Sequence, residues 1–234
     1  MTKILIALAT YNERDNLPDL LDAISRVLPQ ADLLVVDDHS PDGTGDYVLQ
    51  RARQDSRLHL LARSGKLGLG TAVVDALLFG LTHDYDYIVN MDADGSHPAE
   101  FLPALLDAAL GADEPDVVIG SRYVSGGKIV GWPLRRRLAS RAMNLFSRFV
   151  LRLNTRDNTG AFRCYRSATL RKLDFSQFRS RGYSFFEEML FRLRKKGARF
   201  VEVPITFVDR VHGHSKVTLR EIVRTLWQIL MLRL

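Results

Sequence analysis

The sequence has little cysteine and no long apolar run, and each shortage limits what the protein can be. Its single cysteine among 234 residues, Cys164, excludes a disulfide framework and favours a reducing compartment. Cys164 lies in GAFRCYRS, which is typical of a buried strand, so we expect an inert core thiol. No apolar stretch approaches about eighteen residues, the length of a membrane-spanning helix. The first residues lack the features of a secretory signal, and we expect a cytoplasmic protein that is soluble or peripheral.

What the sequence does have is an alternation of apolar strands with helices. The helical segment after the first strand carries apolar residues three and four apart, at Leu17, Leu20, Leu21 and Ile24. This alternation predicts an α/β fold with a mostly parallel central sheet flanked by helices. The chain is long enough for one such domain. The expected strands lie within KILIALAT, ADLLVVDD, LHLLAR, YDYIVNMD and DVVIGSRY.

The most informative motif is MDADGSHP, which places Asp92 and Asp94 directly after the apolar run YDYIVN. Because side chains alternate along a strand, a strand that ends in D-x-D projects both carboxylates to the same side. Two carboxylates with open positions between them suit Mg²⁺ or Mn²⁺ bound together with a phosphate group. The alternative is a solvated acidic turn, since D-x-D alone is a weak motif. Other polar residues also follow expected strands, at Tyr11, Glu13, Asp37 and Asp38.

The net charge of +6 hides opposite charges in the two halves of the chain. Residues 1–120 carry 8 Lys and Arg against 20 Asp and Glu, whereas residues 121–234 carry 25 against 7. An acidic half suits metal and nucleotide binding, and a basic half suits an anionic partner unless its arginines are simply solvated. Single-stranded nucleic acid would require exposed aromatic rings among the basic residues. We expect no nucleic-acid partner, because the phenylalanines fall at spacings typical of a core: Phe146, Phe149, Phe162, Phe175 and Phe178.

Nine motifs, which together cover nearly the whole chain, occur in an order that matches one known family. They are ATYNE, VVDDHSPDGT, GKLGLGTA, MDADGSHP, GSRYVSGG, GWPLRRRLAS, DNTGAFRCY, GYSFFEEML and VEVPITFVDRVHGHSK. With them the chain resembles the dolichol-phosphate mannosyltransferase (polyprenol monophosphomannose synthase) family, within the inverting glycosyltransferases of family 2. The resemblance implies a single GT-A domain over residues 1–234. Its parts are a nucleotide-sugar and metal half at 1–120, an acceptor half at 121–216 and a C-terminal amphipathic helix at 217–234.

The resemblance implies transfer of mannose from GDP-mannose to a polyprenyl (dolichyl-type) phosphate, with inversion to a polyprenyl β-mannosyl phosphate. Tyr11 can then stack on the nucleobase, while Glu13 and Asp38 can accept hydrogen bonds from base or ribose. Asp37 is expected to support its turn instead. The family's nucleotide-sugar residues match Ala9, Tyr11, Glu13, Val36, Asp38, Asp92, Ala93, Asp94, Arg210 and Lys216.

Metal and acceptor residues are implied in the same way. The metal ligands match Asp92, Asp94 and Ser96, where a divalent ion would neutralise the departing nucleoside diphosphate. The acceptor phosphate is a target for arginine forks, and the matching residues are Arg122, Arg136 and Ser140. A family loop that closes over the donor diphosphate matches Arg210 and Lys216, with Gly213 as its hinge. The implied catalytic residues are Asp92, Asp94, Arg122 and Arg210.

Two positions depart from the family's usual pattern. Gly95 stands where members usually carry a bulky apolar residue, and we expect it to loosen the strand end and alter the metal geometry. Phe186 stands where many members have glutamine, so Glu188 alone keeps the acid of that motif. Either change could shift donor preference. His97 is expected to orient the acidic pair rather than to catalyse.

Two amphipathic segments are candidates for contact with a membrane surface. The first has Trp132 beside an arginine cluster and an apolar face of Leu138, Ala142, Leu145, Phe149 and Val150. The second, at the C-terminus, has Val217, Ile222, Val223, Leu226, Ile229 and Leu230. Either face could instead pack on the protein's own sheet. We expect peripheral association with the cytoplasmic face of a membrane, by surface adhesion or through a small membrane-anchoring subunit.

Three hypotheses for function remain open at this point. The first is the mannosyltransferase just described. The second keeps the chemistry but uses UDP-glucose or another nucleotide sugar, because related polyprenyl-phosphate glucosyltransferases share most of the motifs. The third is a non-catalytic nucleotide-sugar-binding subunit, against which stand the intact residues Asp92, Asp94, Arg122, Arg136 and Lys216.

Overall fold

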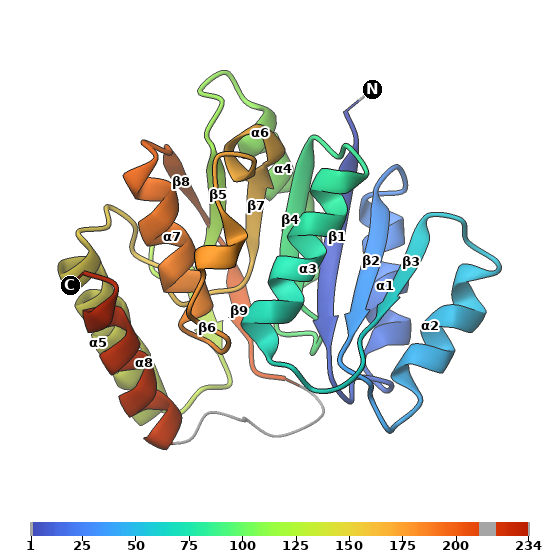
Figure 1. Cartoon of the computed structure of the whole chain (residues 1–234), viewed down its shortest axis with the longest axis horizontal. Coiled ribbons are helices and arrows are strands. Elements are labelled where there is room, and N and C mark those ends of the chain that lie inside the picture. The colour runs from blue at the N-terminus through green and yellow to red at the C-terminus, as the bar shows by residue number, and fades with distance from the viewer. Residues whose placement is uncertain (1, 211–218, 234) are drawn as a thin grey trace.

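The structure is a computed structural model that describes residues 2–210 and 219–233, and one sheet runs across it (Figure 1). In the sheet, β7 runs antiparallel to β4 and β5, while the other described pairs are parallel. The strand order is β3-β2-β1-β4-β7-β5-β8. The predicted mostly parallel sheet is therefore confirmed. Its strands are β1 (Ile4–Thr10), β2 (Asp32–Asp37), β3 (Leu58–Ala62), β4 (Tyr87–Asp92), β5 (Val117–Ser121), β7 (Arg163–Arg166) and β8 (Phe200–Pro204).

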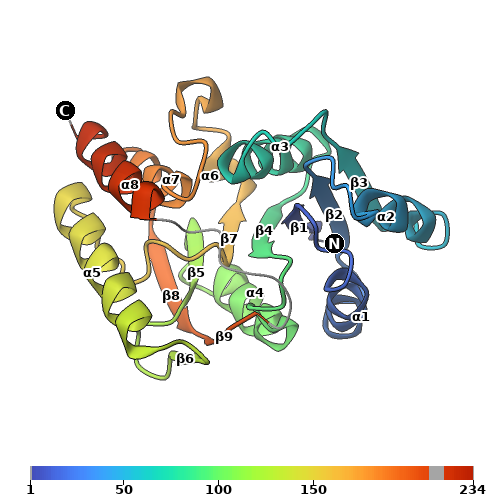
Figure 2. The ribbon, with the colours of Figure 1, turned by 90° about the horizontal axis from the view of Figure 1, so that it is seen from below.

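Helices cover both faces of the sheet. Figure 2 shows α1 (Leu17–Val27) and α4 (Leu102–Leu110) on one face, and α3 (Leu69–Thr82) with α7 (Phe185–Lys195) on the other. Each face has its own apolar core. The predicted stripe of the first helix is buried at Leu17, Leu20, Leu21 and Ile24. The remaining short elements are α2 (Thr44–Ala52), α6 (Ser167–Leu170) and the 3-10 turns Ala99–Phe101 and Phe175–Gln177.

The central strands are apolar throughout because both of their faces are covered. The sequence ILIALAT of β1 is buried along nearly its whole length. Helix α3 approaches β4 closely at Gly80, where an added Cβ would lie 2.3 Å from the Ile88 Cδ1 atom. Cys164 is buried in β7, and burial raises the pKa of its thiol. It is a core residue, as predicted.

The register of the strands brings their carboxyl ends to one edge of the sheet. Ala9 in β1 lies opposite Asp92 in β4, and Thr10 lies opposite Asp37 in β2. A second, two-stranded parallel sheet joins β6 (Lys128–Val130) to β9 (Thr206–Val208). The amide of Val208 donates a 3.2 Å hydrogen bond to the Ser96 carbonyl, so β9 also reaches the turn that follows Asp92.

Helices α5 (Leu134–Leu151) and α8 (Leu219–Met231) lie side by side at one end of the sheet in both views (Figures 1 and 2). Among the described residues, no helix has the length and apolar content to cross a bilayer. The pair nevertheless presents apolar side chains to solvent. We call this set the α5–α8 apolar face: Leu134, Leu138, Leu145 and Phe149 from α5, and Val223, Trp227 and Leu230 from α8.

The α5–α8 apolar face corrects several sequence-based assignments. Phe149 is 80% exposed, so its predicted place in a core is wrong. Val150 and Ile229 are buried and point away from that face, because each helix also packs inward. Trp227, which the sequence interpretation passed over, is exposed on it. Val217 lies outside the described residues.

Candidate active site

A cavity of about 350 Å³ opens where β1, β2 and β4 end. A second, shallower depression of about 550 Å³ lies beside β3 and α3. Its charged residues Arg63 and Asp75 pair with each other, so they offer little charge to a ligand. The first cavity is therefore the candidate site. Val36 is buried in the core and does not line the cavity, and Lys216 lies outside the described residues. Eight of the ten predicted nucleotide-sugar residues do line it: Ala9, Tyr11, Glu13, Asp38, Asp92, Ala93, Asp94 and Arg210.

The predicted metal residues are brought together at one side of this cavity. Asp92 ends β4, and Asp94 in the next turn accepts the Ser96 N–H at 3.0 Å. The Ser96 hydroxyl is buried and has no hydrogen-bond partner among the described residues. Desolvation, followed by repulsion from Asp94, raises the pKa of Asp92 to about 7. A divalent cation would neutralise the carboxylates and use the hydroxyl oxygen, so these residues fit one.

Two neighbours of the carboxylate pair have structural tasks. Gly95 lies beyond the end of β4, not within it, and adopts a φ of +74°. The expectation that it loosens the strand end is therefore wrong, because this glycine serves the left-handed turn that carries Asp94 and Ser96. His97 accepts the Asp92 N–H at its Nδ1 atom (3.1 Å), and burial lowers its pKa to about 4. It is a neutral ring that helps to hold Asp92, as predicted.

Asp38, directly after β2, forms another part of the cavity wall. Arg63 donates to one oxygen of its carboxylate and the Gly68 N–H donates to the other at 3.2 Å. Lone pairs of both oxygens remain for a ligand. The Lys66 ammonium lies 3.9 Å from the centroid of the Tyr11 ring, the ring that we expect to stack on a nucleobase.

Asp37, next to Asp38, does not line the cavity and stabilises the local chain. Its carboxylate accepts the Ser40 N–H and the Thr10 hydroxyl, each at 2.9 Å. Asp37 therefore supports the turn, as predicted from the sequence.

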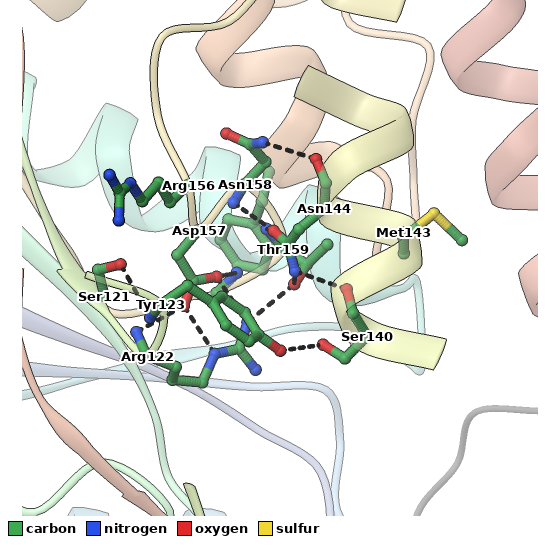
Figure 3. Close-up of polar contacts among 12 residues, drawn as sticks. Ser121, Arg122, Tyr123, Ser140, Met143, Asn144, Arg156, Asp157, Asn158 and Thr159 are labelled. Carbon is green, nitrogen blue, oxygen red and sulfur yellow. Dashed lines mark hydrogen bonds and ion pairs between the residues drawn. The ribbon is translucent and has the colours of Figure 1, made fainter. Parts of the chain in front are cut away.

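The first acceptor arginine, Arg122, follows β5 and is locked by a buried carboxylate (Figure 3). Its Nε and Nη2 atoms donate to the two oxygens of Asp157 at 2.7 and 2.6 Å, and its backbone N–H donates to the same group at 2.9 Å. The guanidinium charge holds the pKa of Asp157 below its usual range despite complete burial. Nη2 also donates to the Thr159 hydroxyl, which leaves Nη1 without a partner among the described residues.

A polar network joins this arginine to α5. The Asn144 side-chain oxygen accepts the N–H groups of Asn158 and Thr159, and its amide nitrogen donates to the Thr159 hydroxyl at 3.1 Å. One turn earlier in α5, the Ser140 hydroxyl accepts the Tyr123 hydroxyl at 2.7 Å (Figure 3). The loop before β7 and the helix that carries Ser140 are thereby fixed relative to each other.

The second acceptor arginine, Arg136, lies close to the first. Its guanidinium stacks 3.9 Å from the Trp132 ring centroid, and Arg122 lies 5.7 Å from the same ring. Its Nη1 atom donates to Asp209 at 3.0 Å. Arg210, the next residue, approaches Asp94 with an Nη2–Oδ2 distance of 3.3 Å. Arg122, Arg136, Arg210 and the carboxylates of Asp92 and Asp94 thus form one continuous site.

Several residues of this site had no role assigned from the sequence. Lys66 and Tyr183 line the cavity, and Asp157, Asn144 and Asp209 hold the groups around it. All but Asn144 lie within motifs that carried the family resemblance, which was the available signal. What the motifs could not give was the partner of each side chain.

The two glutamates of α7 have different surroundings. Glu188 is buried and accepts the N–H groups of Arg179 and Ser180 and the Arg192 guanidinium. It thereby holds the loop that leads to Tyr183 in the cavity wall. Glu187 is also buried, but its Oε2 atom has no hydrogen-bond partner among the described residues.

Comparison with known proteins identifies the family of this chain. Residues 5–174 match glycosyl transferase family 2. The chain is 48% identical over 216 residues to undecaprenyl-phosphate mannosyltransferase of Micrococcus luteus, covering 92% of this chain and 88% of that one. It is 44% identical over 218 residues to polyprenol monophosphomannose synthase of Mycolicibacterium smegmatis, covering 92% and 81%.

Solved structures show the same fold. Glucosyl-3-phosphoglycerate synthase from Mycobacterium tuberculosis, in complex with phosphoglyceric acid, has a TM-score of 0.70 at 20% identity, covering 99% of this chain and 79% of that one. A mannosyltransferase from Pyrobaculum calidifontis, in complex with GDP-Man and Mn²⁺, has a TM-score of 0.59 at 17% identity, covering 91% and 58%.

The chain therefore belongs to glycosyl transferase family 2, the class of enzymes that the GT-A fold and the carboxylate pair indicate. Within that class it is a member of the dolichol-phosphate mannosyltransferase (polyprenol monophosphomannose synthase) family, as its motifs implied.

Proposed function

We propose that this enzyme transfers mannose from GDP-mannose to a polyprenyl phosphate and inverts the anomeric centre. The observation that carries the proposal is the continuity of the site: Asp94 pairs with Arg210, whose neighbour Asp209 pairs with Arg136. A metal-type carboxylate pair thus adjoins arginines suited to a second anion. The names of the relatives, an undecaprenyl-phosphate mannosyltransferase and a polyprenol monophosphomannose synthase, support mannose and a polyprenyl acceptor.

The mechanism follows from the charge of the acceptor. A phosphate monoester has its second pKa at about 6, so the nucleophile is already mostly anionic at neutral pH and needs no strong general base. Arg122, through its Nη1 atom, and Arg136 orient the acceptor phosphate and screen its repulsion from the donor. A Mg²⁺ or Mn²⁺ ion held by Asp92, Asp94 and Ser96 would supply Lewis-acid neutralisation of the leaving diphosphate.

Direct in-line attack by the acceptor oxygen requires no glycosyl-enzyme intermediate, and it converts an α-linked donor into a β-linked product. Asp38 and Glu13 accept hydrogen bonds from the base or ribose, and Tyr11 stacks on the base. All three side chains line the cavity that also contains Asp92 and Asp94.

A comparison of four nucleotides tests the donor. The enzyme is heated with GDP, GDP-mannose, UDP or UDP-glucose, each with Mg²⁺ or Mn²⁺, since a ligand that binds the native state raises its apparent stability. We expect the guanine nucleotides to raise the melting temperature most. A larger shift with UDP-glucose would favour the alternative, a polyprenyl-phosphate glucosyltransferase. No shift with any nucleotide would contradict both.

We also propose that the α5–α8 apolar face lies on the cytoplasmic surface of a membrane, where the lipid acceptor is held. Leu145 and Phe149 are 67% and 80% exposed, and α5 also carries the exposed basic residues Arg141 and Arg148. Such a combination favours an anionic lipid surface. A small membrane-anchoring subunit would strengthen the contact.

Vesicle flotation tests the membrane proposal. We expect the enzyme to float with vesicles that contain anionic lipid and Phe149→Asp to float less. Leu110→Asp is the matched control, because Leu110 is an exposed apolar residue at the end of α4. Equal loss in both variants, or no loss in Phe149→Asp, would contradict the assignment of this face.

A further inference from the structure

Each of the two acceptor arginines is held by an aspartate, but the two pairs differ in kind. Arg122 and Asp157 form a two-pronged pair whose side chains are 7% and 0% exposed. Arg136 and Asp209 share one hydrogen bond of 3.0 Å, and their side chains are 31% and 34% exposed. The first pair is enclosed by protein. The second is open to the site and to any anion that enters it.

Asp209 is fixed in place by the backbone around it. Its N–H donates to the Val130 carbonyl at 3.0 Å, and its Oδ1 atom accepts the Arg210 N–H at 3.2 Å. Gly131, with a φ of +86°, packs directly on it: a Cβ at residue 131 would lie 2.8 Å from the Asp209 Cβ atom. The carboxylate therefore stays beside Arg136 without depending on that arginine for its position.

Arg136 can pair with either of two anions, the Asp209 carboxylate or an acceptor phosphate. Its guanidinium rests on the Trp132 ring, which also faces Arg122, so it points into the region where both arginines meet. The anion that pairs with Arg136 there is the Asp209 carboxylate. A guanidinium prefers a phosphate dianion, with which it forms charge-assisted forks, to a single carboxylate oxygen.

We propose that the Asp209 carboxylate competes with the acceptor phosphate for the Arg136 guanidinium and thereby limits the affinity for the acceptor. The inference rests on the proposed polyprenyl-phosphate acceptor and adds a competing anion to it. The acceptor phosphate and the Asp209 carboxylate compete for the same guanidinium, because both are anions that accept its N–H groups. An uncharged polyprenol carries no such anion and is indifferent to the charge of Asp209.

Competition between the carboxylate and the phosphate predicts opposite effects for an aspartate-to-asparagine substitution at the two positions. Asp209→Asn removes a competing charge from Arg136, while its side-chain oxygen still accepts the Arg210 N–H. Asp157→Asn instead removes the group that orients Arg122, which serves the acceptor phosphate directly. Binding of the phosphorylated acceptor should therefore tighten in Asp209→Asn and weaken in Asp157→Asn.

Calorimetry with farnesyl phosphate, in the presence of GDP and Mg²⁺, measures both effects on the full chain. For Asp209→Asn we expect a dissociation constant about two- to fivefold lower than that of the wild type. This is the change in affinity that corresponds to the interaction energy of one half-exposed ion pair. Binding of farnesol, which carries no charge, should not change. The matched control is Asp84→Asn, which breaks a similar 2.9 Å ion pair with Arg171 at the opposite edge of the sheet.

The outcomes separate the inference from the proposed function. Suppose that the wild type binds farnesyl phosphate normally and Asp209→Asn binds it equally well or more weakly. That result would overturn the competition of Asp209 for Arg136 and leave the acceptor assignment standing. Wild-type enzyme that binds the donor but not farnesyl phosphate would overturn the proposed acceptor, and the inference with it.

Discussion

Replacement of Glu187 by glutamine should change how the stability of the enzyme depends on pH. Glu187 is 1% exposed in α7, and its Oε2 atom has no hydrogen-bond partner among the described residues. Desolvation raises the pKa of its carboxyl group from 4.5 to about 7. Arg163 and Arg122 act in the opposite direction, and Asp157 adds to the rise. Glutamine has nearly the same shape and does not ionise.

The sign of the effect follows from proton binding. With its raised pKa, the folded state holds the proton at pH values where the unfolded state has released it, so stability falls as the pH rises from about 4.5 to 7. Each pKa unit corresponds to about 1.4 kcal/mol, and the loss between pH 5 and pH 8 is therefore on the order of 2 to 3 kcal/mol. Glu187→Gln should lack this loss.

Urea denaturation at pH 5 and pH 8 measures the difference. We expect the variant to gain stability relative to the wild type, on the order of 2 to 3 kcal/mol between the two pH values, because only the wild type ionises a buried group there. Glu114→Gln is the control, since Glu114 has a side chain that is 62% exposed. A difference between Glu187→Gln and wild type that stayed constant with pH would refute the argument that burial raises this pKa.

Three further predictions concern activity and packing. Asp94→Asn should lose most transferase activity while the fold stays intact by circular dichroism, and full activity of this variant in EDTA would refute the metal site. Arg136→Ala should raise the KM for polyprenyl phosphate by roughly thirtyfold, about 2 kcal/mol, with donor binding unchanged by calorimetry, and Arg136→Lys should recover only part of it. Gly80→Val should lower the melting temperature, because its side chain would collide with Ile88 under α3; an unchanged melting temperature would show that the helix can shift.

The sequence predicted those parts of the site that lie within one motif. The D-x-D pair follows a strand directly, so the local pattern placed both carboxylates in the cavity. The roles of Asp157 and Asp209 could not be read in this way. Their arginine partners lie 35 and 73 residues away, and only the folded chain brings each pair together.

The amphipathic helices show a second limit of sequence interpretation. A hydrophobic stripe states which residues share a face but not what covers that face. In α5 the chain buries Val150 and exposes Phe149, its direct neighbour. The buried side packs on the protein core, as one of the two alternatives predicted, and the exposed side is the one on which the membrane proposal rests.

The position of β7 has a consequence for how the enzyme tolerates change. This strand follows the acceptor arginines in the chain, yet it lies between β4, which ends in Asp92, and β5, which leads to Arg122. The side chain of Asn90 in β4 donates a 2.8 Å hydrogen bond to the Ala161 carbonyl just before β7. The distance between Asp92 and Arg122 is therefore set by the hydrogen-bonded strands β4, β7 and β5. If the proposed roles of these two residues hold, a substitution that disrupts β7 should raise the KM of both substrates together.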